Sequence, residues 1–103
     1  MTNYLADVQK YDAAAEAATV DKIVKHLGIA LRSRDASLVA ADDPEELARV
    51  REKWCMKKLG ESDAARADSA IAKVCETMAA DRTKSRVTFY YLVAKQLGKL
   101  PAV

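Results

Sequence analysis

The chain has 103 residues, of which 50% are hydrophobic and 31% charged, with only 3 glycines and 2 prolines. This length supports one hydrophobic core, and the composition excludes a disordered chain and disfavours a protein built of strands and turns. The formal net charge of +2 does not indicate a nucleic-acid or membrane partner unless the basic residues gather on one face. We therefore predict a single all-α domain, residues 1–103, of four to five helices.

The first half of the chain predicts two helices. One covers residues 3–10, where apolar side chains recur at helical spacing (Tyr4, Leu5, Val8 and Tyr11). The other follows Asp12 as its N-cap and carries a narrow apolar face (Val20, Ile23, Val24, Leu27 and Leu31). Gly28 allows the second helix to end there, or it continues through Leu31.

The third and fourth helices have clear start signals. Asp43 is an N-cap followed by Pro44 at the first helical position, with Glu46 three residues after the cap. The third helix should run from Pro44 to Gly60, with apolar residues over nearly half its circumference (Leu47, Val50, Trp54, Cys55 and Leu59). The fourth should be capped by Ser62 or Asp63 and end near Asp81.

The fifth helix raises the main question of the sequence. Residues 81–91 read DRTKSRVTFYY, so cations lead directly into three consecutive aromatics. Residues 87–94 are apolar nearly all round a helical wheel, which predicts that the C-terminal helix, about residues 82–97, is buried at the centre of the fold. The aromatic side chains are then core. The helix begins either at Asp81 or with Ser85 as its N-cap.

The cations before this helix have two interpretations. Positive charge at a helix N-terminus opposes the helix dipole, so a negative partner is expected nearby. The partner is either internal, from Asp35, Asp81 or another acid, or a bound phosphate or carboxylate. The internal version is favoured because exposed charge clusters are usually solvated or paired. The external version predicts an anion-binding cluster that also includes the earlier segment RSRDASLV, residues 32–39 (Arg32, Arg34, Arg82, Lys84 and Arg86).

Other chemistries find little support. His26 is the only histidine and is predicted on the flank of the second helix, while Cys75 shares an apolar face with Ile71 and Met78. One histidine and two distant cysteines do not match a zinc site, and neither basic segment has the ligand order that calcium requires. We therefore expect no catalytic residues, no metal and no cofactor.

Three blocks of this sequence resemble a known family. They are GIALRSRDASLV (28–39), DPEEL (43–47) and KSRVTFYYLVAKQLGKL (84–100). The chain resembles a family of short bacterial proteins catalogued only as a domain of unknown function. This resemblance implies a helical fold and a bacterial cytoplasmic setting, and it brings no activity and no catalytic residues.

We predict a non-catalytic interaction module that binds a protein partner or itself. Trp54 and Met56, on the wide apolar arc of the third helix, are the predicted contact residues. The alternative is anion or nucleic-acid binding through the basic cluster. Two cysteines without a disulfide framework, an amino terminus unlike a signal peptide and the lack of an apolar run of about 18 residues favour a cytoplasmic protein without a membrane span.

Overall fold

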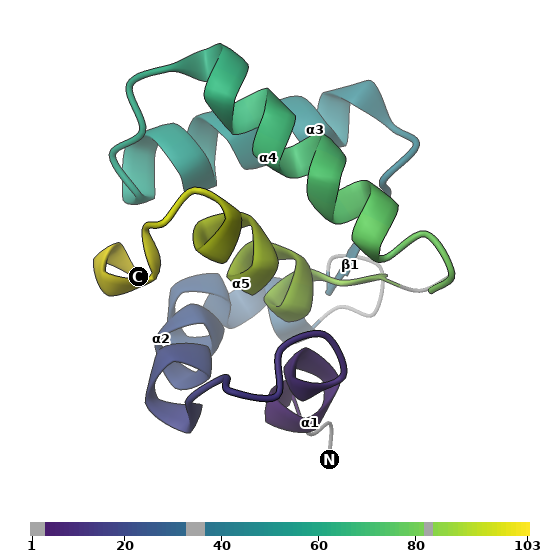
Figure 1. The fold of residues 1–103 in the computed structure, drawn as a ribbon, viewed down its shortest axis with the longest axis vertical. Coiled ribbons are helices and arrows are strands. Elements are labelled where there is room, and N and C mark those ends of the chain that lie inside the picture. Colours follow the sequence, from purple (N-terminus) through teal and green to yellow (C-terminus); the bar gives the residue numbers. More distant parts are fainter. Residues whose placement is uncertain (1–3, 33–36, 82–83) are drawn as a thin grey trace.

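Helices dominate the computed structural model, which describes residues 4–32, 37–81 and 84–103 (Figure 1). The elements are α1 (Tyr4–Gln9), α2 (Ala17–Leu27), η1 (Gly28–Arg32), β1 (Leu38–Val39), α3 (Pro44–Arg49), η2 (Val50–Lys58), α4 (Ala64–Thr77), β2 (Lys84–Ser85), α5 (Arg86–Gln96) and η3 (Leu100–Ala102). The predicted all-α class is confirmed, with one minimal ribbon of two strands added to it. None of the helices in these ranges combines the length and apolar character that a membrane crossing needs.

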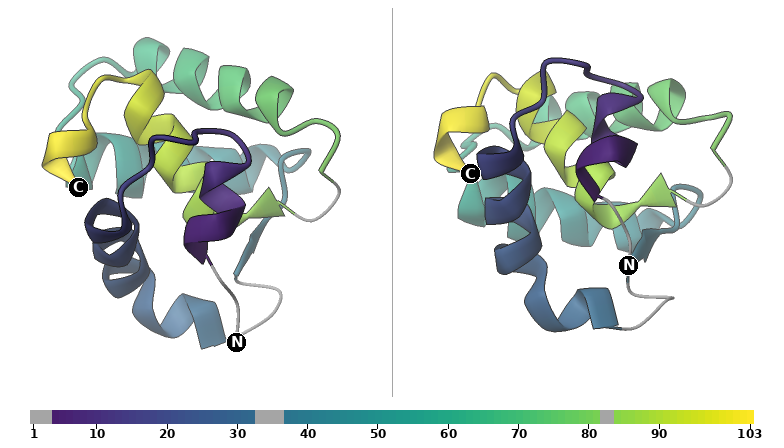
Figure 2. Two further views of the ribbon diagram at one scale, coloured as in Figure 1. Left: turned by 60° about the horizontal axis from the view of Figure 1, so that its bottom comes forward. Right: turned by 90° about the horizontal axis from the view of Figure 1, so that it is seen from below.

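The centre of the fold is α5, as its composition predicts. Every residue from Val87 to Ala94 is buried. Figure 1 shows α4 on one side of α5 and α2 on the other, and Figure 2 shows α1 lying along it. The helix is shorter than the predicted range of about 82–97, because Lys84 and Ser85 pair in the ribbon and Ser85 takes the N-cap position. The later of the two predicted starts is therefore correct.

The side-chain caps predicted for the third and fourth helices are confirmed. The Asp43 carboxylate accepts a hydrogen bond from the Glu45 amide at 3.0 Å, and Asp63 caps α4 through the Ala65 amide at 3.0 Å. The prediction for Asp12 is wrong, because α2 begins only at Ala17. Asp12 instead accepts from the Ala14 amide at 3.1 Å in the turn before α2.

A short antiparallel ribbon joins the two segments that carry the predicted basic cluster. Leu38 pairs with Ser85 and Val39 pairs with Lys84. The strand β1 lies in the connection between η1 and α3, and β2 lies in the connection between α4 and α5. The ribbon thus brings the end of RSRDASLV beside the start of α5.

The predicted third helix is continuous but changes type at Val50. Residues Val50–Lys58 form a π-helix, and the Leu59 amide donates to the Trp54 carbonyl at 2.9 Å. In an α-helix, at about 100° per residue, Val50 and Leu59 would lie roughly 180° apart. At about 82° per residue, as bonds from i to i+5 imply, they lie within about 20° of each other. The wider turn therefore gathers the buried residues Val50, Trp54, Cys55 and Leu59 on one side.

Candidate functional site

Arg86, the last residue of the predicted basic cluster, is held inside the protein. Its side chain is 13% exposed, and its Nη2 lies 2.5 Å from Oε1 of Glu46. The same guanidinium donates to the carbonyl oxygen of Leu38 at 3.0 Å and to the hydroxyl of Tyr90 at 3.3 Å. Its negative partner is thus internal. The acid is Glu46, which the sequence placed at the start of a helix and did not pair with α5.

Glu46 completes this buried network through a second arginine. Its Oε2 lies 2.8 Å from Nη2 of Arg49, one turn further along α3. Burial alone would raise the pKa of Glu46, but the hydrogen bonds from Arg49 and Arg86 outweigh it and lower the pKa. The carboxylate is therefore ionised near neutral pH and neutralises Arg86, which has no free charge for a ligand.

The Glu46 pair predicts an acid-sensitive contribution to stability. Because the pKa of Glu46 is lower in the folded chain than its ordinary value of 4.5, the contribution is full above that value and is lost as pH falls through the folded pKa. The free energy of unfolding should therefore fall between about pH 6 and about pH 3, measured by denaturant titration at each pH. Glu46→Gln should flatten this fall. Glu45→Gln, an exposed neighbour on the same helix, should not, and equal slopes in the two variants would contradict the assignment.

Besides Arg86, the structure describes two cations of the predicted cluster, Lys84 and Arg32. Lys84 donates from Nζ to the carbonyl oxygen of Asp81 at 2.7 Å and lines an open pocket of about 440 Å³ with Cys75 and Asp42. Arg32 is exposed at the end of η1. Arg34 and Arg82 lie outside the described residues.

Trp54 is a core residue and not an exposed anchor for a partner. Its side chain is fully buried, its ring centroid lies 4.8 Å from that of Tyr90, and its Nε1–H donates to the Tyr90 carbonyl at 3.0 Å. Met56 is half-buried. The wide apolar arc that suggested a contact surface on this segment is explained by the π-helix, which turns the apolar residues inward. In this fold Trp54 offers no surface to a partner.

A group of exposed cations lies where α2 meets η2. The ring of His26, on α2, lies 5.1 Å from that of Trp54, on η2. Burial, followed by the charge of Lys58, lowers the pKa of His26. Lys22, one turn before His26 on α2, instead borders an open pocket with Asp12 and Glu16. On η2, Lys53, Lys57 and Lys58 fall within about 80° of one another because of the π-helical turn.

We refer to His26, Lys53, Lys57 and Lys58 as the lysine face. All four are exposed. Among the described residues, none of the three lysines lies within ion-pair distance of a carboxylate. The face is therefore a concentration of positive charge that the described fold does not pair. The sequence reasoning missed it because the tertiary structure sets both the π-helical turn, which brings Lys58 within about 80° of Lys53 and Lys57, and the packing of His26 on Trp54.

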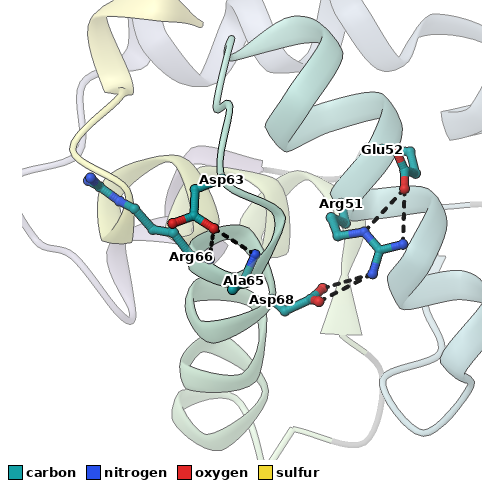
Figure 3. A network of polar contacts seen from close by, with 6 residues as sticks. All are labelled: Arg51, Glu52, Asp63, Ala65, Arg66 and Asp68. Carbon is teal, nitrogen blue, oxygen red and sulfur yellow. Dashed lines mark hydrogen bonds and ion pairs between the residues drawn. The ribbon is translucent and has the colours of Figure 1, made fainter.

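On the opposite side of η2, the positive charge is paired with acids. Figure 3 shows Arg51 between two acids. Its Nη2 lies 2.9 Å from Glu52, and its Nη1 lies 3.2 Å from Asp68 of α4. Arg66 of α4 is likewise paired, with Glu61 at 3.1 Å. On η2, Arg51 is thus paired towards α4, whereas the lysines on the side of His26 have no described ion pair.

Helix dipoles favour only some of the cations on the lysine face. His26 lies in the last turn of α2, and Lys57 and Lys58 lie in the last turn of η2. Cations are favoured there, because they offset the negative end of the dipole. The effect falls off within that turn, so it does not account for Lys53.

A second polar cluster ties the loop before α2 to α5. Asp12 Oδ2 accepts from the hydroxyl of Tyr91 at 2.7 Å and lies 3.0 Å from Nζ of Lys95. An open pocket of about 460 Å³ borders these residues. Burial, followed by the bond to Asp12, raises the pKa of Tyr91 to about 12. The hydroxyl therefore stays protonated at neutral pH, and the cluster holds the loop in place without supplying a base.

The thiols are poorly suited to nucleophilic chemistry. Burial, reinforced by Asp68 and Glu61, raises the pKa of Cys55 to about 12. Burial also raises the pKa of Cys75, although Lys84 opposes it. Thiolate is the reactive form, so neither residue is activated at neutral pH. Within residues 4–32, 37–81 and 84–103, no three side chains of histidine, cysteine, aspartate or glutamate are grouped to hold a metal ion.

Comparison with known proteins identifies a family for this chain but assigns it no activity. The model of a family described as "Protein of unknown function (DUF2853)" matches residues 3–101. A search of curated proteins finds no match. The match therefore covers nearly the whole chain without assigning a role to any residue.

Proposed function

The chain belongs to the DUF2853 family of proteins of unknown function, and we propose that it is a non-catalytic interaction module that binds an anionic partner through the lysine face. The free thiols Cys55 and Cys75 support placing it in a reducing compartment, the bacterial cytosol. No catalytic role is part of the proposal, because the best-formed polar clusters, around Glu46 and Asp12, have their charges paired internally.

One observation carries this proposal. The π-helical turn of η2 gathers Lys53, Lys57 and Lys58 on one side, beside His26, with no described carboxylate in ion-pair range. Like charges held close together repel, and the described fold offsets that cost only through the helix dipole at Lys57 and Lys58. An anionic partner would offset it.

This proposal moves the binding surface away from the residues that the sequence singled out. Arg86 is neutralised by Glu46, and Trp54 is buried. The idea of an interaction module is kept, and so is the idea of a cationic site. Both now rest on the exposed junction of α2 and η2.

The test compares two variants that lose the same charge at different places. Lys53→Gln/Lys57→Gln removes two cations from the lysine face, and Lys73→Gln/Lys99→Gln removes two unpaired lysines from outside it. On a heparin column, the first variant should elute at clearly lower salt than the wild type, and the control close to it. Equal elution of the two variants would show that only net charge matters, and would overturn the proposal.

A further inference from the structure

We infer that the anionic partner is the phosphate backbone of a double-stranded nucleic acid, held by the lysine face without reading the bases. This inference rests on the proposed function and names its ligand. It follows from the types of residue on the face and from the spacing of the phosphate charges along a duplex.

The residue types argue against an acidic protein. Protein interfaces are enriched in aromatic residues and arginine and depleted in lysine. The energetic anchors of such interfaces are typically tryptophan, tyrosine and arginine. Arg49, one turn before Lys53, is already paired with Glu46 at 2.8 Å, and the rings of Trp54 and Tyr90 are 0% and 7% exposed. Compact ammonium charges without an apolar anchor suit phosphates.

The same features argue against a single strand. Proteins that bind single strands combine a basic groove with exposed aromatic rings on which the bases stack. The one ring on the face, His26, already lies against Trp54, with 5.1 Å between ring centroids. A duplex needs no stacking platform. It carries one charge per about 1.7 Å of its axis, so closely spaced lysines can each reach a phosphate without a special register.

The three lysines determine the expected strength of the salt effect. Burial and Lys58 lower the pKa of His26, so the imidazole is mostly neutral at pH 7 and does not add a charge. If each of the three lysines neutralises one phosphate, the slope of log K against log salt concentration should be about −2.7 for duplex DNA. Removing Lys53 and Lys57 should reduce the slope to about −0.9.

The experiment measures fluorescence anisotropy of labelled polyanions titrated with the full chain at several salt concentrations. The probes are a DNA duplex, an RNA duplex, a DNA single strand of matched charge and poly-L-glutamate. We expect both duplexes or one of them to bind at low salt, with the slope above. The comparison between them identifies which nucleic acid is preferred. Lys53→Gln/Lys57→Gln should reduce the slope to about a third of its wild-type value, and Lys73→Gln/Lys99→Gln should leave it unchanged.

The other results separate this inference from the proposed function. Binding of poly-L-glutamate as tight as that of the duplexes would overturn the phosphate assignment and leave the anionic interaction module standing. Tighter binding of the single strand would overturn the duplex assignment. Failure of every probe to bind at low salt would overturn both proposals. Because the substituted lysines carry no described ion pair, the melting temperature of each variant should stay near that of the wild type, which checks that the fold is intact.

Discussion

Replacing Arg86 with methionine is expected to lower the free energy of unfolding by up to about 3 to 5 kcal/mol, because it removes the buried one of the two arginines that hold the buried Glu46 carboxylate and leaves only the more exposed Arg49. The Glu46 side chain is 9% exposed and lies 2.5 Å from the guanidinium. The same substitution removes the bond to the Leu38 carbonyl, which ties β1 to the start of α5. Chemical denaturation followed by circular dichroism would measure the change.

A matched control uses an arginine in an exposed pair. Arg51→Met breaks contacts to Glu52 and Asp68, whose side chains are 58% and 54% exposed, and should cost at most about 1 kcal/mol. The double variant Glu46→Gln/Arg86→Met should be less destabilised than the sum of its single variants, because they share one interaction. If Arg86→Met matched Arg51→Met, the internal role of Arg86 would be wrong and an external anion would again have to be considered.

Truncating Trp54 to alanine should also be severe, with a cost of about 3 to 5 kcal/mol. The fully buried indole packs between His26 and Tyr90 and joins α2 to α5 through η2. Trp54→Phe keeps much of the apolar contact but loses the bond to the Tyr90 carbonyl, so it should be milder than Trp54→Ala. Thermal and denaturant unfolding of the variants would establish this order.

Met56 is the control for Trp54. It lies on the same helix but is half-buried, so Met56→Ala should cost less than Trp54→Ala. Trp54 is also the only tryptophan, and its fluorescence in the wild type should be blue-shifted and resistant to iodide quenching. An accessible indole, together with an unchanged unfolding midpoint in Trp54→Ala, would show that Trp54 is not a core residue. The prediction that it contacts a partner would then stand again.

The features that the sequence predicted well depend on neighbours within a few residues. Asp43 and Asp63 were recognisable because a side chain that caps a helix bonds amides two or three positions away. The burial of α5 followed from apolar residues on all its sides. Asp12 shows the limit of such signals, since its carboxylate does bond a nearby amide, of Ala14, but no helix starts there.

The candidate site was predicted less well, because its residues are chosen by contacts across the fold. The sequence left open whether Arg86 meets an internal acid or a ligand, and named Asp35 and Asp81 as internal candidates. The structure pairs it with Glu46, whose position three residues after an N-cap already had a local explanation. Nothing local distinguishes a glutamate that supports its helix start from one that neutralises a distant arginine.

By itself, the sequence determined the all-α class, the capped starts of α3 and α4 and the burial of α5, because propensity, capping and apolar periodicity act over one or two helical turns. Only the tertiary structure decided that Val50–Lys58 is a π-helix, that Trp54 faces the core and that the lysines of η2 stand unpaired beside His26. These outcomes depend on packing against α4 and α5. A wider helical turn is stable here because it buries Val50, Trp54, Cys55 and Leu59 on one side, and that gain exists only once the neighbouring helices are in place.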